Sequence, residues 1–444
     1  MRLSMGCSIA DITQARHRPV HTQSGFFGPW VVRATFVMAM FGWGVGFYGP
    51  PIFLHTVVQR TGWPLALVST AVTVHYLFGA LVVTRLPDLH RRFGVGPTAV
   101  LGAAIAALGV LGWSVADAPW QLFAGALVSG AGWVTMGAVA VNAAIAPWYA
   151  RGRPMALAKA YNGASIGGVV FSPLWVLLIA QWGFTTAAAV VGAAMVAVMA
   201  ALARGVYART PERLGQCPDG DTRGASATSA ASPGARVLAG RLLWHDRGFV
   251  TLALGMAAGL FAQIGLLAHL FSLLVPLFGA QAAGLAMGFA TACAIVGRLV
   301  VASVLPAGAN RRTVAALGYG VQLAASVMLL LAGEQQTGLI LFSVALFGSG
   351  IGNATSLPPL IAQAEFAEAD VPRVVALIVA FGQATYAFAP AAFGLVLAAS
   401  PAAGARIGAG TSIFFLALAA VQGVAILCFL AGLGRTRGSG RTGI

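Results

Sequence analysis

Apolar runs of about twenty residues recur along the chain, separated by short polar or Pro/Gly breaks. That is the length an α-helix needs to cross the hydrocarbon core of a bilayer. The pattern predicts about twelve membrane-spanning helices. Their expected spans are 29–54, 63–86, 98–116, 120–146, 154–180, 183–203, 248–275, 282–305, 314–332, 338–361, 374–399 and 407–433.

One break is much longer than the others and is rich in Gly, Ser, Ala and Arg, as flexible linkers are. It covers residues 204–247 and divides the chain into two six-helix halves, 29–203 and 248–433. A polar N-terminal tail (1–28) lacks the apolar core of a signal peptide, and a second tail covers 434–444. We expect both tails and the linker to be cytoplasmic.

Composition supports a membrane protein, since 59% of residues are hydrophobic and only 8% are charged. Soluble domains contain about 25% charged residues. The net charge of +15 is spread over short loops rather than a compact basic domain, which disfavours nucleic-acid binding. The four cysteines have no paired spacing, so neither a disulfide framework nor a metal site is indicated. No catalytic residues, cofactor motif or nucleotide loop is visible, so we expect no enzyme.

Arginine positions predict the orientation. With the N-terminus inside, only Arg60 and Arg406 fall in outer loops, whereas the inner segments hold all the others except Arg298. This is the positive-inside bias of membrane proteins. Both termini are therefore predicted to be cytoplasmic, and a bacterial inner membrane is the expected location.

The two halves resemble each other in sequence. Residues 129–135 (SGAGWVT) match residues 349–355 (SGIGNAT), 220 positions later, and 79–83 (GALVV) match 297–301 (GRLVV), 218 positions later. Matches at nearly one offset, in corresponding helices, indicate a six-plus-six pseudo-repeat. The predicted fold is therefore an all-α membrane protein built from two six-helix pseudo-repeats.

Several motifs resemble those of the major facilitator superfamily. Residues 79–94, ending LPDLHRRFG, look like its signature between helices 2 and 3. Residues 148–156 (WYARGRPMA) resemble the helix 5 signature of monocarboxylate transporters, and 41–44 (FGWG) are similar to part of their helix 1 motif, without its acidic residue. Residues 210–220 look like a linker segment of bacterial relatives. The chain thus resembles the monocarboxylate transporter and oxalate-formate antiporter group, which implies a substrate site between the halves.

Arg298 is the first candidate for substrate binding. It lies about 10 Å from the inner end of the predicted span 282–305, at 1.5 Å per residue. An arginine at such a depth costs roughly 2.5–3.5 kcal/mol. Its repeat counterpart is Ala80, so the scaffold does not require a cation there. The resemblance implies carboxylate binding by Arg298, but the acidic residue of proton-coupled relatives is replaced by Ala294. The alternative is a side chain that reaches the interface or backbone carbonyls.

Lys159, the one lysine, lies in the predicted span 154–180. No acidic residue falls within any of the predicted apolar runs. Two cations without acidic partners suggest that the substrate is an anion. Lys159 is close enough to the cytoplasmic end to reach the headgroups instead.

Other polar residues within the apolar runs are secondary candidates. His75 and His269 could carry a proton, or could be neutral helix contacts. Gln263, Asn353, Gln383 and Tyr386 are predicted substrate contacts, although buried amides also bridge helices.

Asp88, Arg91 and Arg92 could form a gate on the cytoplasmic side by charge pairing, or a solvated loop.

These features predict a secondary active or facilitated transporter that acts by alternating access. The expected partners are the lipid bilayer and a small anionic substrate, preferably a monocarboxylate, and we expect a functional monomer. Efflux of amphipathic or drug-like compounds is the alternative, in which Arg298 would be structural. A non-transporting receptor is disfavoured because no additional soluble domain is visible.

Overall fold

The computed structural model describes residues 25–220, 243–304, 309–367, 370–399, 407 and 411–433. All secondary structure in this part of the chain is helical. Most of the predicted N-terminal tail, the middle of the predicted linker and almost all of the predicted C-terminal tail lie outside the described residues.

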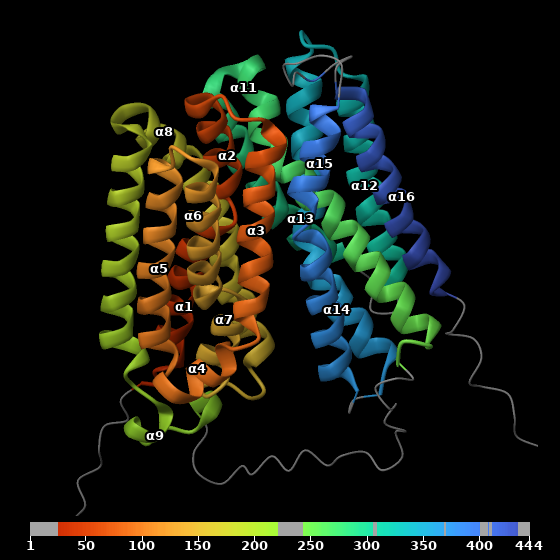
Figure 1. Ribbon diagram of the computed structural model, residues 1–444. Coiled ribbons are helices and arrows are strands. Elements are labelled where there is room, and N and C mark those ends of the chain that lie inside the picture. The colour runs from red at the N-terminus through yellow and green to blue at the C-terminus, as the bar shows by residue number, and fades with distance from the viewer. Residues whose placement is uncertain are drawn as a thin grey trace, which may run out of the picture.

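The N-terminal half is a bundle followed by a short linker segment (Figure 1). Its helices are α1 Gly28–Gly46, α2 Gly49–Thr61, α3 Leu65–Val83, α4 Leu86–Phe93, α5 Val95–Val115, α6 Pro119–Trp133, η3 Val134–Met136, α7 Ala138–Ile145, α8 Arg153–Leu202, η4 Ala203–Tyr207, α9 Pro211–Leu214 and η5 Pro218–Gly220.

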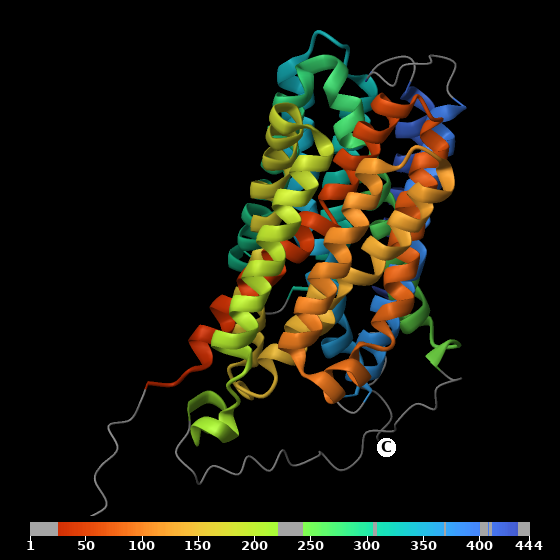
Figure 2. The same ribbon diagram turned by 60° about the vertical axis from the view of Figure 1, so that its left-hand side comes forward.

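The C-terminal half is a second bundle beside the first (Figures 1 and 2). Its helices are α11 Arg247–Val304, α12 Arg311–Leu331, α13 Thr337–Glu365, α14 Val371–Tyr386, α15 Ala389–Ala398 and α16 Ser412–Ala431.

The two longest helices, α8 and α11, each hold two membrane spans. Gly183 within α8 has φ 76° and Gly279 within α11 has φ 77°, in the left-handed region that favours glycine. At each glycine the chain turns and crosses back. Ten helical stretches of the described chain are long and apolar enough to span a membrane. With α8 and α11 each divided in two, this gives the twelve spans that the sequence predicts.

Proline explains a break within a span. Helix α14 ends at Tyr386, and α15 begins at Ala389, next to Pro390. Proline has no N–H for the helical ladder and its ring displaces the preceding turn. The backbone groups around this break find partners on two other helices. The Pro390 carbonyl accepts from His269 Nε2 at 3.0 Å, and the Ala391 N–H donates to Thr73 Oγ1 at 3.0 Å.

Interactions between the halves lie toward the end opposite α4 and α9 (Figure 1). Helix α3 meets α15 there: a Cβ on Gly394 would lie 2.5 Å from Ser69 Oγ, so only glycine permits this approach. Nearby, His55 Nδ1 and Ser272 Oγ are 3.3 Å apart. We refer to the end with α4 and α9 as the linker side and to the other as the far side. The structure is thus a state closed on the far side.

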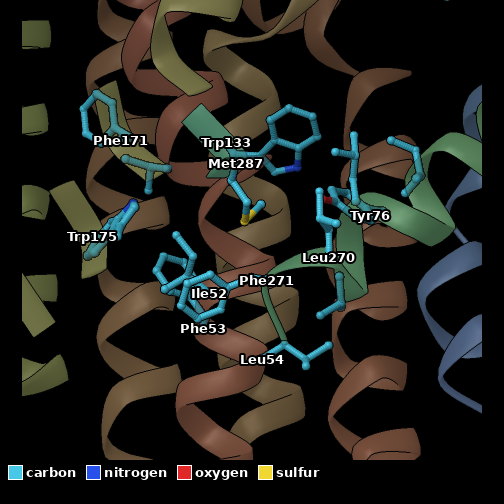
Figure 3. Packing of buried hydrophobic residues seen from close by; sticks show 14 of the residues in the cluster. Ile52, Phe53, Leu54, Tyr76, Trp133, Phe171, Trp175, Leu270, Phe271 and Met287 are labelled. Carbon is cyan, nitrogen blue, oxygen red and sulfur yellow. The ribbon is translucent and has the colours of Figure 1, made fainter. Parts of the chain in front are cut away.

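Small residues bring α8 and α11 together across the halves. A Cβ on Gly168 would lie 2.6 Å from Thr291, and one on Gly284 would lie 2.9 Å from Val176. Where no polar side chains bond between two membrane helices, close packing of their backbones through small residues is the main attraction between them. Aliphatic and aromatic side chains fill the space beside it, and Phe271 of α11 and Phe53 of α2 belong to the same buried cluster (Figure 3).

Candidate functional site

Residues 297–298 of α11 and residues 352–353 of α13 join these two helices within the C-terminal half. The Nε of Arg298 donates to the Gly352 carbonyl at 3.3 Å, and Asn353 Nδ2 donates to the Gly297 carbonyl at 3.4 Å. A Cβ on Gly297 would collide with the Ser349 carbonyl, so the helices can approach only because this position is glycine. The reciprocal bonds hold the Arg298 side chain at a fixed place on α11.

The rest of the Arg298 guanidinium has no acidic partner among the described residues. Its side chain is half-buried, and the one hydrogen bond the structure gives it uses Nε. The two terminal nitrogens keep four N–H donors, which form the edge that suits a carboxylate. Tyr48, where α1 meets α2 in the other half, lies near Arg298. The site therefore has a cation from one half and a phenol from the other.

The predicted amide contacts fall into two groups. Gln263 is buried and accepts a bond from Gln322 Nε2 at 3.3 Å, which ties α11 to α12. Asn353 is also buried, and its amide serves the α11–α13 joint. Both amides thus have partners within the C-terminal half. Gln383 is half-buried on α14.

Tyr386 is the predicted contact residue that meets the other half. Its ring lies 6.0 Å from the ring of Tyr76 on α3, nearly perpendicular to it. Trp133 lies 6.1 Å from Tyr76 and 6.3 Å from Trp43, and Tyr161 lies 6.1 Å from Trp43. These five rings form an aromatic cluster that reaches across the two halves.

His75 lies in a buried polar network of the N-terminal half. Its Nε2 is 2.9 Å from the Gly46 carbonyl, and its Nδ1 is 2.9 Å from Ser129 Oγ. Ser129 also accepts from Trp113 Nε1 at 3.1 Å and can donate to the Ala126 carbonyl. Because the serine hydroxyl can turn between His75 and Ala126, the network has hydrogen-bond partners for either protonation state of the histidine.

His269 has a different environment, near the contact between α3 and α15 on the far side. Its Nε2 binds the Pro390 carbonyl, and its Nδ1 is buried without a hydrogen-bond partner in the described chain. In a neutral ring with Nε2 as the donor, Nδ1 is an unused acceptor. The two candidate histidines therefore sit in separate halves and share no contact in this part of the chain.

Lys159 is exposed on α8, and no ion pair or hydrogen bond of its side chain is present among the described residues. The structure does not bring it into contact with Arg298. Its role in substrate binding stays a prediction.

The sequence analysis missed a buried ion pair. Arg312 is fully buried, with Nε and Nη2 bound to the two carboxylate oxygens of Glu365 at 2.7 and 2.8 Å. Its remaining donors reach the Gly248 carbonyl and Thr251 Oγ1. The expectation that no acid enters the apolar helices is wrong here, because α13 continues to Glu365 instead of ending near residue 361. Arg312 likewise belongs to a helix rather than a loop.

The predicted gate is a local interaction in this state. Arg91 donates to Asp88 at 2.6 Å within α4, and both side chains are largely exposed. Arg92 lies over the ring of Phe93. Exposed ion pairs contribute little to stability, so these contacts form no latch between the halves here. A gating role in another state stays a prediction.

Comparisons with known proteins agree with this architecture. The family model described as the Major Facilitator Superfamily matches residues 33–390. A search of curated proteins finds no match.

Solved structures are similar over nearly the whole chain. One is a bacterial homologue of the human lysosomal transporter Spinster, in an inward-facing and unoccupied conformation, with a TM-score of 0.66, 14% identity and coverage of 92% of this chain and 98% of that one. The nucleoside transporter NupG has a TM-score of 0.65, 11% identity and coverage of 92% and 99%. At such identities the likeness shows the fold alone.

The fold defines a polytopic membrane transporter with two six-helix pseudo-repeats. The chain belongs to the major facilitator superfamily.

Proposed function

We propose that this transporter carries small organic anions, with monocarboxylates as the preferred class, and that Arg298 binds the substrate carboxylate. One observation carries the proposal: a half-buried guanidinium within a membrane-spanning helix that has no acidic partner in the described chain. A carboxylate substrate would supply the missing charge and fit the planar edge of the two terminal nitrogens.

The free-energy cost of Arg298 supports a functional reason for it. An arginine inside the membrane costs roughly 2.5–3.5 kcal/mol on insertion scales, and a single bond to a backbone carbonyl offsets only part of that. The pseudo-repeat has Ala80 at this place, so the architecture does not need a cation. Intramembrane charges of this kind usually mark a substrate or ion pathway.

Alternating access would follow from the placement of the site. Arg298 belongs to the C-terminal half, and Tyr48, its neighbour, belongs to the N-terminal half. An anion bound to Arg298 and hydrogen-bonded by the Tyr48 hydroxyl would draw the two halves together around it. The halves would then rock about the close α8–α11 contact at Gly168 and Thr291.

The aromatic cluster favours the alternative function, which is efflux of amphipathic or drug-like compounds. Tyr76 and Tyr386 meet across the halves, with Trp133 and Trp43 behind them. Such rings bind flat apolar compounds and cations through their faces. In that case Arg298 would be a structural residue that joins α11 to α13 through its bond to the Gly352 carbonyl.

Proton coupling through His75 or His269 remains part of the proposal. His75 fits better, because its network accommodates both protonation states. If His75 carries the proton, His75→Ala abolishes the response of uptake to an imposed pH gradient. Uptake that is indifferent to the gradient in both the parent and the variant would exclude proton coupling.

Ligand-dependent thermal stabilisation of the purified protein separates the two functions. We expect small carboxylates to raise the melting temperature of the parent but not of Arg298→Gln. Stabilisation by hydrophobic cations, equal in the parent and in Arg298→Gln, would favour the efflux function and contradict the anion proposal.

A further inference from the structure

The first part of the linker is folded onto the linker-side end of the N-terminal half. Residues 210–220 contain α9, whose first turn is capped by Thr210 Oγ1, and η5. Between them Gly215, with φ 61°, reverses the chain. We call residues 210–220 the strap.

Asp219 is the main contact between the strap and the bundle. Its carboxylate accepts backbone N–H bonds from Ala150 at 3.1 Å, Arg151 at 2.8 Å and Gly152 at 3.0 Å. Its own N–H donates to the Trp148 carbonyl at 2.9 Å. These three residues directly precede Arg153, where α8 begins. The carboxylate thus binds the loop up to Gly152, the residue immediately before α8, and its negative charge lies near the start of that helix, where negative charge is favoured.

The backbone of Asp219 indicates that this contact is strong. Asp219 is the non-glycine residue of the described chain with positive φ, at 61°. This conformation costs a side chain-bearing residue about 1 kcal/mol. In this conformation the carboxylate accepts three N–H bonds, and these contacts offset the cost.

A second contact joins the strap to the start of α1. Gln216 Oε1 accepts from the Phe27 N–H at 3.0 Å, and Gln216 Nε2 donates to the Gly25 carbonyl at 3.4 Å. The ring of Phe26 lies 5.4 Å from that of Tyr149, in the loop that Asp219 holds. The strap therefore connects the entry to α1 with the loop before α8.

We propose that Asp219, supplied by the linker, fixes the start of α8 by binding the backbone of the loop before it, and that docking of the strap orders the 148–152 loop. The linker is then a structural element of the N-terminal half as well as a tether. Helix α8 carries the Gly168 contact with α11. A loosened α8 start should therefore slow the conversion between states without changing the anion contact on α11.

The charge of Asp219 sets the pH range of this docking. Burial by itself raises the pKa of Asp219. The bonds from Arg151, Gly152 and Ala150 and the Arg151 charge outweigh it, so the pKa lies below its usual range. Burial and the same carboxylate raise the pKa of the neighbouring Tyr149. A depressed acid stabilises the docked form above its unfolded pKa, and the contribution is lost as pH falls through the lowered value. Docking should therefore persist at neutral and mildly acidic pH.

Backbone hydrogen exchange in the full-length protein tests the proposal without any substrate. In Asp219→Asn we expect exchange at the amides of residues 150–152 to become at least about tenfold faster. The control is Glu212→Gln, which removes the same charge from an exposed position in the strap and should leave exchange unchanged.

Unchanged exchange in Asp219→Asn would overturn the proposal. If Asp219→Asn does not fold, Gly152→Ala replaces it, because its Cβ would lie 2.9 Å from Asp219 Oδ1 and should displace the strap. In transport, Asp219→Asn should lower the maximal rate several-fold with an unchanged KM. A changed KM at an unchanged rate would contradict the assigned role. Because exchange is measured without substrate, its outcome is independent of the substrate class.

Discussion

Replacing Arg298 with glutamine tests both the substrate class and the reason for a charge in the membrane. The guanidinium has five N–H donors, and its Nε is bound to the Gly352 carbonyl. Four donors on the two terminal nitrogens are left for a ligand. Arg298→Gln removes the charge and this planar edge but keeps a polar side chain of shorter length.

The expected loss of affinity follows from the number of bonds. A hydrogen bond to a charged group contributes about 1.5–3 kcal/mol net, so a carboxylate bound by two of them loses about 3 kcal/mol at the low end. That is roughly a 150-fold increase in Kd. Arg298→Lys keeps the charge but offers one point contact. It should lose about 1.5 kcal/mol, or roughly tenfold in Kd.

Stability should change in the opposite direction. The uncharged side chain avoids the cost of about 2.5–3.5 kcal/mol for an arginine in the membrane, so Arg298→Gln without ligand should melt at the same temperature as the parent or higher. A variant that is at least as stable but binds poorly is typical of a residue kept for function.

Calorimetric titration of purified protein with small monocarboxylates measures Kd, and thermal melting measures stability. The matched control is Arg311→Gln, which removes one charge from a half-buried position on the same half, where Nη1 donates to the Leu360 carbonyl. It should leave Kd unchanged. If Arg298→Gln binds carboxylates as the parent does, or melts at a markedly lower temperature, Arg298 is a structural residue and the proposed anion site is wrong.

Three further predictions concern the scaffold. Glu365→Gln leaves the buried Arg312 without its partner and should destabilise the protein by about 3 kcal/mol; an unchanged melting temperature would show the pair to be dispensable. Gly394→Ala places a methyl group 2.5 Å from Ser69 Oγ and should disfavour far-side closure, so spin-label distances across the far side should lengthen; unchanged distances would place closure elsewhere. In a variant whose remaining cysteine is Cys217, a membrane-impermeant thiol reagent should label inverted vesicles but not intact cells, and labelling of intact cells would reverse the assigned orientation.

Much of the fold could be predicted from the sequence, because membrane spans depend on run length alone. Twelve apolar runs gave twelve spans, and the 220-residue offset indicated the pseudo-repeat. Turn geometry was less accessible. The predicted breaks at 181–182 and 276–281 adjoin Gly183 and contain Gly279, where the chain turns, but the left-handed backbone at each glycine could not be read from run length. Helix ends were also less exact, since α13 continues to Glu365 whereas its predicted span ends at 361.

The polar interactions were predicted less well, since they depend on which helices meet. Arg312 was assigned to a loop because Arg311 and Arg312 come just before an apolar run. Its burial depends on Glu365, which lies 53 positions away on α13. Extending the predicted span 338–361 by one helical turn would have included Glu365 and suggested the ion pair. The strap could be recognised as a motif, but its target could not, because Asp219 and Ala150 are joined only by the fold.

Arg298 illustrates the opposite case. Its unusual position was visible from one residue type in an apolar run, and the structure adds the Gly352 carbonyl that fixes it. What the sequence could not supply was the neighbour from the other half, Tyr48.

Counterflow in proteoliposomes tests the central claim most directly. Vesicles that hold purified protein and an unlabelled small carboxylate are diluted into a trace of the labelled compound, with Arg298→Gln and Arg311→Gln vesicles in parallel. We predict transient accumulation of label in the parent and in Arg311→Gln, and none in Arg298→Gln. Accumulation that is equal in all three, or that occurs with hydrophobic cations instead of carboxylates, would contradict the account.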